Sequence, residues 1–393
     1  MKTYKVGVVG MGHGRSHARL VHRYLDRTEC TLICDVNTER LAKEAAELGI
    51  GRTTTRYADL LADPDLDIVC IASPCHVHGP MTLAALEAGK HVMVEVPMEN
   101  ESMDRLWKIV QMAERRHLKV QMDCPDRWIP DSVRMKRLID DGAVGEVYYV
   151  IAEYIQDMRR QGLINKVNFR MGYGVKAQEP ISAGAGIYAV DTARWFLANQ
   201  PGGEFAEVFA YGNRMNFPTR NVDDHEVALF RTQAGAVARV QCSKGAIRPY
   251  KEIFRSVWGT RGTLESTGYY PAPADSTGLY GALGQDPSTP NAMYPLEVPP
   301  LPLPAGVTPE MATRVGHSGV EFFSWLDLVR SIDDDVMSQI NVYESARTCA
   351  AAIAVRTSKD EHRPVAIPRI TDRHEELRPL YPLPYASASS EDL

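Results

Sequence analysis

Short apolar runs alternate with helix-like segments through the first 120 residues, and this alternation limits the possible folds more than any other feature. Strands are predicted at residues 5–10, 30–35, 67–72, 91–95 and 119–122, and helices at 15–26, 38–48, 57–62, 77–88 and 101–116. Apolar strands alternating with helices are typical of a parallel sheet covered on both faces. The sequence therefore predicts an α/β fold that begins with a doubly wound, nucleotide-binding domain over residues 1–125.

The pattern changes after residue 130. Period-2 alternation predicts strands at 147–155, 207–211, 226–231, 236–242 and 251–258, and helices are expected at 131–140, 186–197, 318–331 and 341–358. Strands in long runs with few helices between them indicate an α+β domain with a large open, mainly antiparallel sheet. We assign it residues 126–375, with a proline-rich excursion at 271–312, and interpret 376–393 as a flexible tail.

Composition excludes several classes of protein. The chain has 393 residues, 24% of them charged, and a net charge of -6, which is ordinary for a globular protein and gives no general affinity for nucleic acid or an anionic membrane. The sequence contains no run of about 18 apolar residues, so it predicts no transmembrane helix. The N-terminus enters a strand without a signal-peptide pattern, so the expected compartment is the cytoplasm.

The sequence shows no pattern that predicts a metal site. Seven cysteines form no CxxC pair, which argues against structural zinc. Asp223, Asp224 and His225 are metal-binding residue types, but consecutive residues on a strand face opposite sides. We therefore expect no metal.

A glycine turn, Gly10-Met-Gly12-His-Gly14, directly follows the first predicted strand and opens the first helix. In that position glycines let the backbone approach a pyrophosphate, and the helix N-terminus attracts its charge. Asp35 ends the second strand, where a carboxylate accepts bonds from ribose hydroxyls and repels a 2′-phosphate. No arginine follows immediately, so NAD is expected in preference to NADP.

Several segments resemble the Gfo/Idh/MocA family of oxidoreductases. They are the glycine turn, CDVNTER (34–40), IASPCHVHGPMTLAALEAGKHVMVEVPM (71–98), MKRLIDDGAVGEV (135–147), WGTRGTLE (258–265) and residues 342–368. The resemblance implies a Rossmann domain that carries NAD(P) and a second domain whose open sheet shapes the substrate pocket and often the oligomer interface. It also implies hydride transfer between the cofactor and a hydroxyl group of a sugar or cyclitol.

Site residues are assigned from the glycine turn and the resemblance together. Cofactor binding is predicted at Gly10, Met11, Gly12, His13, Gly14, Arg15, Asp35, Val36, Ala72, Ser73, Pro74, His78, Glu95, Val96 and Pro97. Substrate binding is predicted at Cys124, Arg127, Trp128 and Tyr154. For Arg127, a structural ion pair is an equal alternative to substrate binding. For His76, His78 and His317, capping of a helix is the alternative to a role at the site.

The chain departs from the family at both proton-transfer motifs. Where relatives carry E-K-P it has Glu95-Val96-Pro97, and at the position of the second motif's histidine it has Tyr188. Because valine cannot accept a proton, we predict Tyr188 as the acid/base if a nearby cation lowers its pKa, with Lys176 as that cation or as the base itself. Asp191, which the motif retains, is expected to orient the site. Packing and surface roles are the respective alternatives for Tyr188 and Lys176.

Three functions remain open at this point. The first is an NAD-dependent oxidoreductase with an atypical acid/base centre, acting on the hydroxyl or keto group of a sugar, glycoside or cyclitol-like substrate. The second is a redox-neutral lyase or glycosidase that keeps NAD bound. The third is a non-catalytic NAD-binding sensor, which Val96 favours. A homo-oligomer, dimer or tetramer, is expected through the open sheet, where Val147, Tyr149 and Ile151 form an apolar row.

Overall fold

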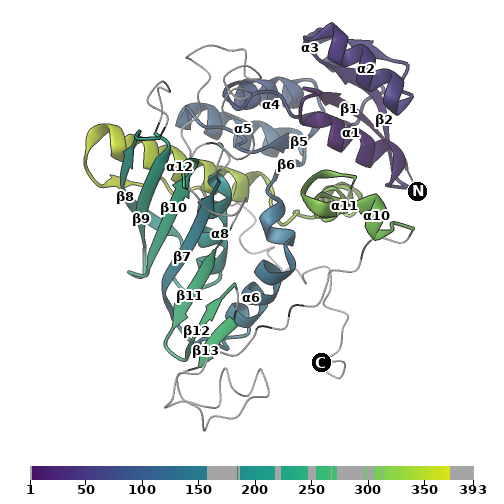
Figure 1. Cartoon of the computed structure of the whole chain (residues 1–393). Coiled ribbons are helices and arrows are strands. Elements are labelled where there is room, and N and C mark those ends of the chain that lie inside the picture. Colours follow the sequence, from purple (N-terminus) through teal and green to yellow (C-terminus); the bar gives the residue numbers. More distant parts are fainter. Residues whose placement is uncertain are drawn as a thin grey trace.

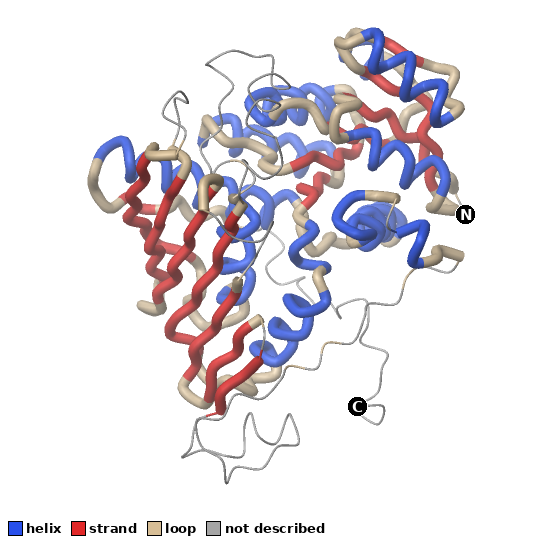
Figure 2. Tube along the Cα trace, in the orientation of Figure 1, coloured by secondary structure: helices blue, strands red, loops and turns tan. Residues whose placement is uncertain are grey.

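The computed structural model describes residues 2–156, 184, 186–216, 223–246, 254–266, 268–271, 296, 298, 303, 306–312 and 314–371. Its strands form two sheets, one of six strands and one of eight (Figure 2). Most of the predicted proline-rich excursion, the predicted tail and Lys176 lie outside the described residues.

The first sheet is parallel and has the order β3-β2-β1-β4-β5-β6. This is the predicted doubly wound arrangement, and its order reverses between β1 and β4. The strands are β1 (Tyr4–Val9), β2 (Thr28–Cys34), β3 (Thr53–Thr54), β4 (Ile68–Ile71), β5 (His91–Glu95) and β6 (Val120–Asp123). The helices are α1 (Gly14–Arg23), α2 (Thr38–Leu48), α3 (Tyr57–Leu61), α4 (His78–Glu87) and α5 (Met103–Arg116).

The central strands are buried along their length, as their apolar runs predict. All four residues of β4, for example, are fully buried. Strand β3 escaped prediction because it is only two residues long and mostly polar.

The second sheet has the order β13-β12-β11-β7-β10-β9-β8-β14 and is mainly antiparallel, with one parallel pair, β7 and β10. The strands are β7 (Val147–Ile155), β8 (Phe205–Asn213), β9 (His225–Thr232), β10 (Val237–Ser243), β11 (Arg255–Gly259), β12 (Gly262–Glu265), β13 (Gly268–Pro271) and β14 (Val365–Ala366). Helices α6 (Pro130–Asp140), α8 (Ile187–Leu197) and α12 (Val342–Glu361) lie beside one face of this sheet (Figure 1).

The opposite face of this sheet is partly exposed. Tyr211, Leu229 and Trp258 are among its large, solvent-exposed apolar side chains, and Tyr149 packs edge-on against Trp258. Val147, expected in the same apolar row, instead lies in the core. The alternation along the described strands therefore leaves one face of the sheet partly open, as the sequence predicts, with ion pairs such as Arg231–Glu207 among its apolar side chains.

Helices α10 (Pro309–Ala312) and α11 (Glu321–Asp333) return to the first sheet, although sequence alone assigned their residues to the second domain. Phe322, Trp325 and Leu328 share a core with β1 and α1. The Tyr4 hydroxyl donates to Asp333 at 2.7 Å, and the Gln121 amide donates to the Ser324 carbonyl oxygen at 2.7 Å. No helix in the described part of the chain is long and apolar enough to cross a membrane.

Candidate functional site

The glycine turn lies at the point where the strand order reverses. Gly10 has φ +90, and a side chain there would overlap the Ala72 carbonyl at the end of β4. A Cβ at Gly14 would come within 2.8 Å of Val8, whereas a Cβ at Gly12 would meet only the Arg40 guanidinium, at 3.9 Å. Two glycines therefore pack the turn tightly and the middle one leaves space beside the backbone. Ligands of doubly wound sheets bind at this switch point.

The start of α1 suits an anion. Its N-cap residue, His13, makes no side-chain capping bond. The first turn carries no acidic residue, so the positive end of the helix dipole is not neutralised by the helix itself. His13 and Arg15 are well exposed beside it, with side chains 73% and 52% accessible.

Asp35 organises the turn from the end of β2. Its Oδ2 accepts bonds from the Met11 N–H at 2.8 Å and the Arg40 guanidinium at 3.3 Å, and its Oδ1 accepts from the Asn37 N–H at 2.8 Å. A carboxylate has about four acceptor positions, so three donors leave room for one hydroxyl. Arg40, five residues after Asp35, is a cation that sequence reasoning missed. Val36, next to Asp35, is exposed.

His78 ties together the ends of β4 and β5. Its ring nitrogens lie 2.8 Å from the Pro97 carbonyl oxygen and 2.6 Å from the Ser73 carbonyl oxygen. Val96 is half-buried against the core between Glu95 and Pro97, and Pro74 precedes the helical turn that leads to His78. The predicted cofactor residues of β1, β4 and β5 are thus brought to one edge of the sheet.

A buried acid–base cluster, missed by sequence reasoning, lies at the ends of β5 and β6. Glu95 and Asp123 are register partners on these strands. His17 of α1 places its Nε2 2.9 Å from Glu95 Oε1 and 3.6 Å from Asp123 Oδ2. The side chains are 12%, 1% and 3% exposed for Glu95, Asp123 and His17. Acidic residues ending two neighbouring parallel strands were the signal in the sequence that could have revealed this cluster.

Burial and mutual charge shift both enclosed groups of this cluster. Burial is the main cause that raises the pKa of Asp123 to about 7; Glu95 and Glu321 raise it further, whereas His17 and Ser324 oppose the shift. For His17, burial acts against a ring charge, whereas the bond to Glu95 and the charge of Asp123 favour a proton on Nε2. The cluster therefore retains a proton near neutral pH.

The ligand atoms of His17, Glu95 and Asp123 lie within 4.8 Å of one another, close enough to raise the question of a metal ion. The Trp325 indole N–H, however, donates to His17 Nδ1 at 3.0 Å. A histidine that binds a metal through Nε2 carries its proton on Nδ1 and donates it. The indole donor at Nδ1 thus opposes metal binding at Nε2 in this group of described residues.

Tyr188 lies on α8 and faces this cluster. Burial, followed by the charge of Glu95, raises the pKa of Tyr188 well above its ordinary value, and its ring lies 5.8 Å from that of Tyr154. The condition set by the sequence, a nearby cation that lowers this pKa, is not met among the described residues. Because Lys176, the cation named for that role, lies outside the described residues, the acid/base role of Tyr188 stays a prediction.

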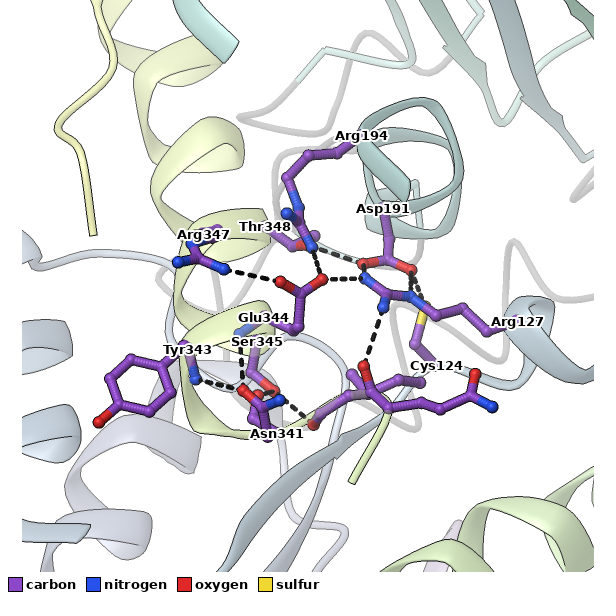
Figure 3. A network of polar contacts seen from close by, with 12 residues as sticks. Cys124, Arg127, Asp191, Arg194, Asn341, Tyr343, Glu344, Ser345, Arg347 and Thr348 are labelled. Atoms are coloured by element: carbon purple, nitrogen blue, oxygen red, sulfur yellow. Dashed lines mark hydrogen bonds and ion pairs between the residues drawn. The ribbon is translucent and has the colours of Figure 1, made fainter. Parts of the chain in front are cut away.

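Asp191 lies in a buried ionic network that joins α8, α12 and the chain after β6 (Figure 3). Arg127 binds Asp191 with two bonds, from Nε at 2.7 Å and from Nη2 at 2.8 Å, and Thr348 donates to Asp191 at 2.7 Å. Glu344 accepts from Arg127 at 3.1 Å, from Arg347 at 2.8 Å and from Arg194. Burial would raise the pKa of Asp191, but Arg127 outweighs it and lowers this pKa.

This network changes the role expected for three residues. Cys124, Arg127 and Trp128 are enclosed by protein rather than exposed to a substrate. The remaining Arg127 nitrogen, Nη1, donates to the Gln339 carbonyl oxygen at 3.0 Å, and Cys124 Sγ lies 3.4 Å from Asp191. The structure therefore favours the ion-pair alternative for Arg127, because its donors already have internal partners.

Profiles of known families match segments of both domains. The profile of the oxidoreductase family with an NAD-binding Rossmann fold, GFO_IDH_MocA, matches residues 4–124, and the profile of the GFO/IDH/MocA C-terminal domain matches residues 132–265.

Curated relatives carry two kinds of name. A glycosyl hydrolase family 109 protein of Saccharopolyspora erythraea is 25% identical over 406 residues, covering 94% of this chain and 84% of the relative. Inositol 2-dehydrogenase 3 of the same organism is 29% identical over 281 residues, covering 71% of this chain and 76% of the relative.

Solved structures share the fold over almost the whole chain. Scyllo-inositol dehydrogenase from Lactobacillus casei, with bound NAD(H) and scyllo-inositol, has a TM-score of 0.71 at 21% identity and covers 93% of this chain and 99% of its own. Levoglucosan dehydrogenase in complex with NADH has a TM-score of 0.73 at 19% identity, covering 94% and 100%. The chain thus belongs to the Gfo/Idh/MocA family of oxidoreductases, and its first domain is an NAD-binding Rossmann domain.

Proposed function

We propose that this protein is an NAD-dependent oxidoreductase that acts on a hydroxyl or keto group of a sugar, glycoside or cyclitol-like substrate. The observation that carries the proposal is the common edge of the first sheet. The glycine turn, the Asp35 carboxylate and the acid–base cluster at Glu95 all lie at the carboxyl ends of its strands. The residues proposed for nucleotide binding therefore lie beside those proposed for proton transfer.

The described residues fit the cofactor. The space at Gly12 and the uncapped start of α1 suit the pyrophosphate, and Asp35 retains an acceptor position for the ribose. When bound, NAD⁺ supplies a hydride acceptor. Tyr188, which stays protonated, would donate a hydrogen bond to the reacting oxygen, and the Arg127–Asp191 pair would hold α8 in place behind it. Lys176 remains a candidate to assist Tyr188.

The carbohydrate part of the proposal is supported by names among the relatives. The structural neighbours include dehydrogenases with scyllo-inositol and with levoglucosan bound, and a curated relative is named an inositol 2-dehydrogenase. Of these neighbours' properties, we extend only the substrate class, polyhydroxylated rings, to this chain.

A redox-neutral glycosidase is the second candidate. Several relatives that align with most of this chain are named glycosyl hydrolase family 109 proteins. In that chemistry NAD stays bound, a transient oxidation acidifies a neighbouring C–H bond, elimination breaks the glycosidic bond, and the cofactor is restored. The valine at position 96 also keeps a non-catalytic NAD-binding sensor as a third candidate.

One experiment separates the three. The purified protein is incubated with NAD⁺ and a panel of cyclitols, anhydrosugars, free sugars and chromogenic glycosides. NADH formation is followed by absorbance, and product formation by chromatography. Net NADH supports the oxidoreductase, glycoside cleavage without net NADH supports the glycosidase, and NAD binding without either product supports the sensor.

A further inference from the structure

Arg40 places a positive charge at the end of β2, directly beside Asp35. It lies in the first turn of α2, and its backbone N–H donates at 2.8 Å to the side chain of Asn37, the residue that caps the start of that helix. From this position its guanidinium Nη1 lies 3.3 Å from Asp35 Oδ2. The capped helix start thus holds an arginine next to the carboxylate that is expected to bind the adenosine ribose.

The same guanidinium borders the glycine turn. A Cβ built at Gly12 would meet only Arg40 Nη1, at 3.9 Å, among the atoms of the described residues. Gly12 is the position where the turn leaves space for a pyrophosphate, and Asp35 is the position expected to bind the ribose. Arg40 therefore lies beside both parts of the dinucleotide site.

Arg40 is the accessible member of its ion pair. Its side chain is 40% exposed, whereas that of Asp35 is 5% exposed. Asp35 is held from the protein side, because it also accepts from the backbone N–H groups of Met11 and Asn37, both at 2.8 Å. A guanidinium has several N–H donors, and within the described part of the chain that of Arg40 donates to Asp35 alone. A ligand at this site would therefore meet unused donors on Arg40.

This ion pair changes what a 2′-phosphate on the ribose would meet. A lone carboxylate at Asp35 would repel the phosphate, and that repulsion is the reason to expect a preference for NAD. With Arg40 Nη1 at 3.3 Å, the positive charge offsets much of the negative one. A phosphate monoester carries a charge of about −1.5 to −2 at neutral pH, and an arginine can bind its oxygens in a bidentate manner.

We propose that Arg40 is a specificity-determining residue of the cofactor site, which binds the 2′-phosphate of NADP and so allows the chain to accept NADP as well as NAD. NAD stays the tighter ligand, because Asp35 remains beside the phosphate. The proposal rests on the dinucleotide site of the proposed oxidoreductase and leaves its substrate and reaction unchanged. Arg40 acts here through its charge and its hydrogen bonds, and no covalent bond is formed or broken.

Calorimetry with NAD⁺ and NADP⁺ tests the proposal on the purified protein without any substrate. Arg40→Met removes the charge and keeps a long side chain. It should lower the affinity for NADP⁺ by about 10–100-fold, the usual contribution of hydrogen bonds to a charged group, and the affinity for NAD⁺ by less than about threefold. An equal loss for both cofactors, or an unchanged affinity for NADP⁺, overturns the proposal.

Arg23→Met is the matched control for this measurement. Arg23 is an exposed arginine at the end of α1 away from the glycine turn, where it donates to the Glu47 carbonyl oxygen. Its replacement removes the same charge from the same domain and should leave both affinities unchanged. A loss of NADP⁺ affinity in Arg23→Met as large as that in Arg40→Met would show a general effect of charge and would refute binding by Arg40.

A second pair of variants separates direct binding of the phosphate from support of Asp35. In Asp35→Asn the carboxylate is gone, so Arg40 can no longer act by neutralising it. The affinity for NADP⁺ should rise by about tenfold or more, because a like charge beside the phosphate is removed. Adding Arg40→Met to this variant should lower the affinity for NADP⁺ by about 10–100-fold. If the double variant binds NADP⁺ as tightly as Asp35→Asn does, Arg40 does not bind the phosphate.

Binding and turnover can fail separately in these experiments. If Arg40→Met selectively loses NADP⁺ but no substrate yields NADH or NADPH, the role of Arg40 is supported and the proposed oxidoreductase is refuted. If a sugar gives NADH while Arg40→Met binds NADP⁺ like wild type, the oxidoreductase is supported and the role of Arg40 is refuted.

Discussion

Replacing Asp123 with asparagine should change how stability depends on pH. The folded protein holds the pKa of Asp123 at about 7, above the value of 3.8 expected when the chain is unfolded. Its contribution to stability is therefore fully present below pH 3.8 and is lost as the pH rises through 7. At about 1.36 kcal/mol per unit, the difference of roughly three units amounts to about 4 kcal/mol. Roughly 3 kcal/mol of this should disappear between about pH 5 and pH 9.

Urea unfolding of wild type and Asp123→Asn at a series of pH values measures this difference. Asparagine cannot ionise, so the free energy of unfolding of the variant should increase relative to that of wild type as the pH rises. Asp63→Asn is a control with the opposite sign, because bonds to the Asp65 N–H and to Arg52 outweigh burial and lower the pKa of Asp63. Asp63→Asn should be less stable than wild type at neutral pH, and the difference in stability should shrink as the pH falls. A constant difference between Asp123→Asn and wild type would refute the reasoning.

Four further outcomes are expected. Calorimetry should show that the wild-type protein binds NAD more tightly than NADP, and Asp35→Ala should lower the affinity for NAD and reduce the difference between the two affinities. Equal or tighter binding of NADP by the wild-type protein contradicts this. Arg127→Met should cost about 3–5 kcal/mol in urea unfolding, since it leaves Asp191 and Glu344 buried beside fewer cations, and a loss below about 1 kcal/mol would disprove it. Tyr188→Phe should reduce turnover by about 10²–10³-fold, the usual loss when one donor to the reacting oxygen is removed, and leave NAD affinity nearly intact, whereas undiminished turnover would place the donor elsewhere. Light scattering should show a homo-oligomer, and Leu229→Glu on the exposed sheet face should dissociate it; a monomeric wild type at micromolar concentration rules this out.

Much of the fold follows from local sequence patterns. Strand β5 and strand β7 begin and end at the predicted residues, because each is a continuous run with clear boundaries. Strands β12 and β13 were missed, since each has four residues and contains glycine. The parallel pairing of β7 with β10 depends on which strands meet in space, and periodicity carries no information about that.

The site was less accessible to sequence reasoning for a physical reason. The glycine turn and Asp35 act through local backbone geometry, which a motif records. The role of His17 instead depends on Trp325, 308 residues away, and the role of Arg127 depends on partners in two distant helices. Such long-range contacts determine which charged residues are available to a substrate and which are already neutralised.

The return of α11 to the first sheet has a consequence for biosynthesis. Ribosomal synthesis delivers all six strands of the Rossmann sheet by residue 123, yet the core around β1 and α1 is completed only by Phe322, Trp325 and Leu328. Contacts this distant in sequence form slowly, and an uncovered apolar face is prone to aggregation in the meantime. A nascent chain must therefore keep this face protected while the entire second domain emerges. For the same reason, a fragment cut at residue 125 should precipitate unless α11 is supplied with it.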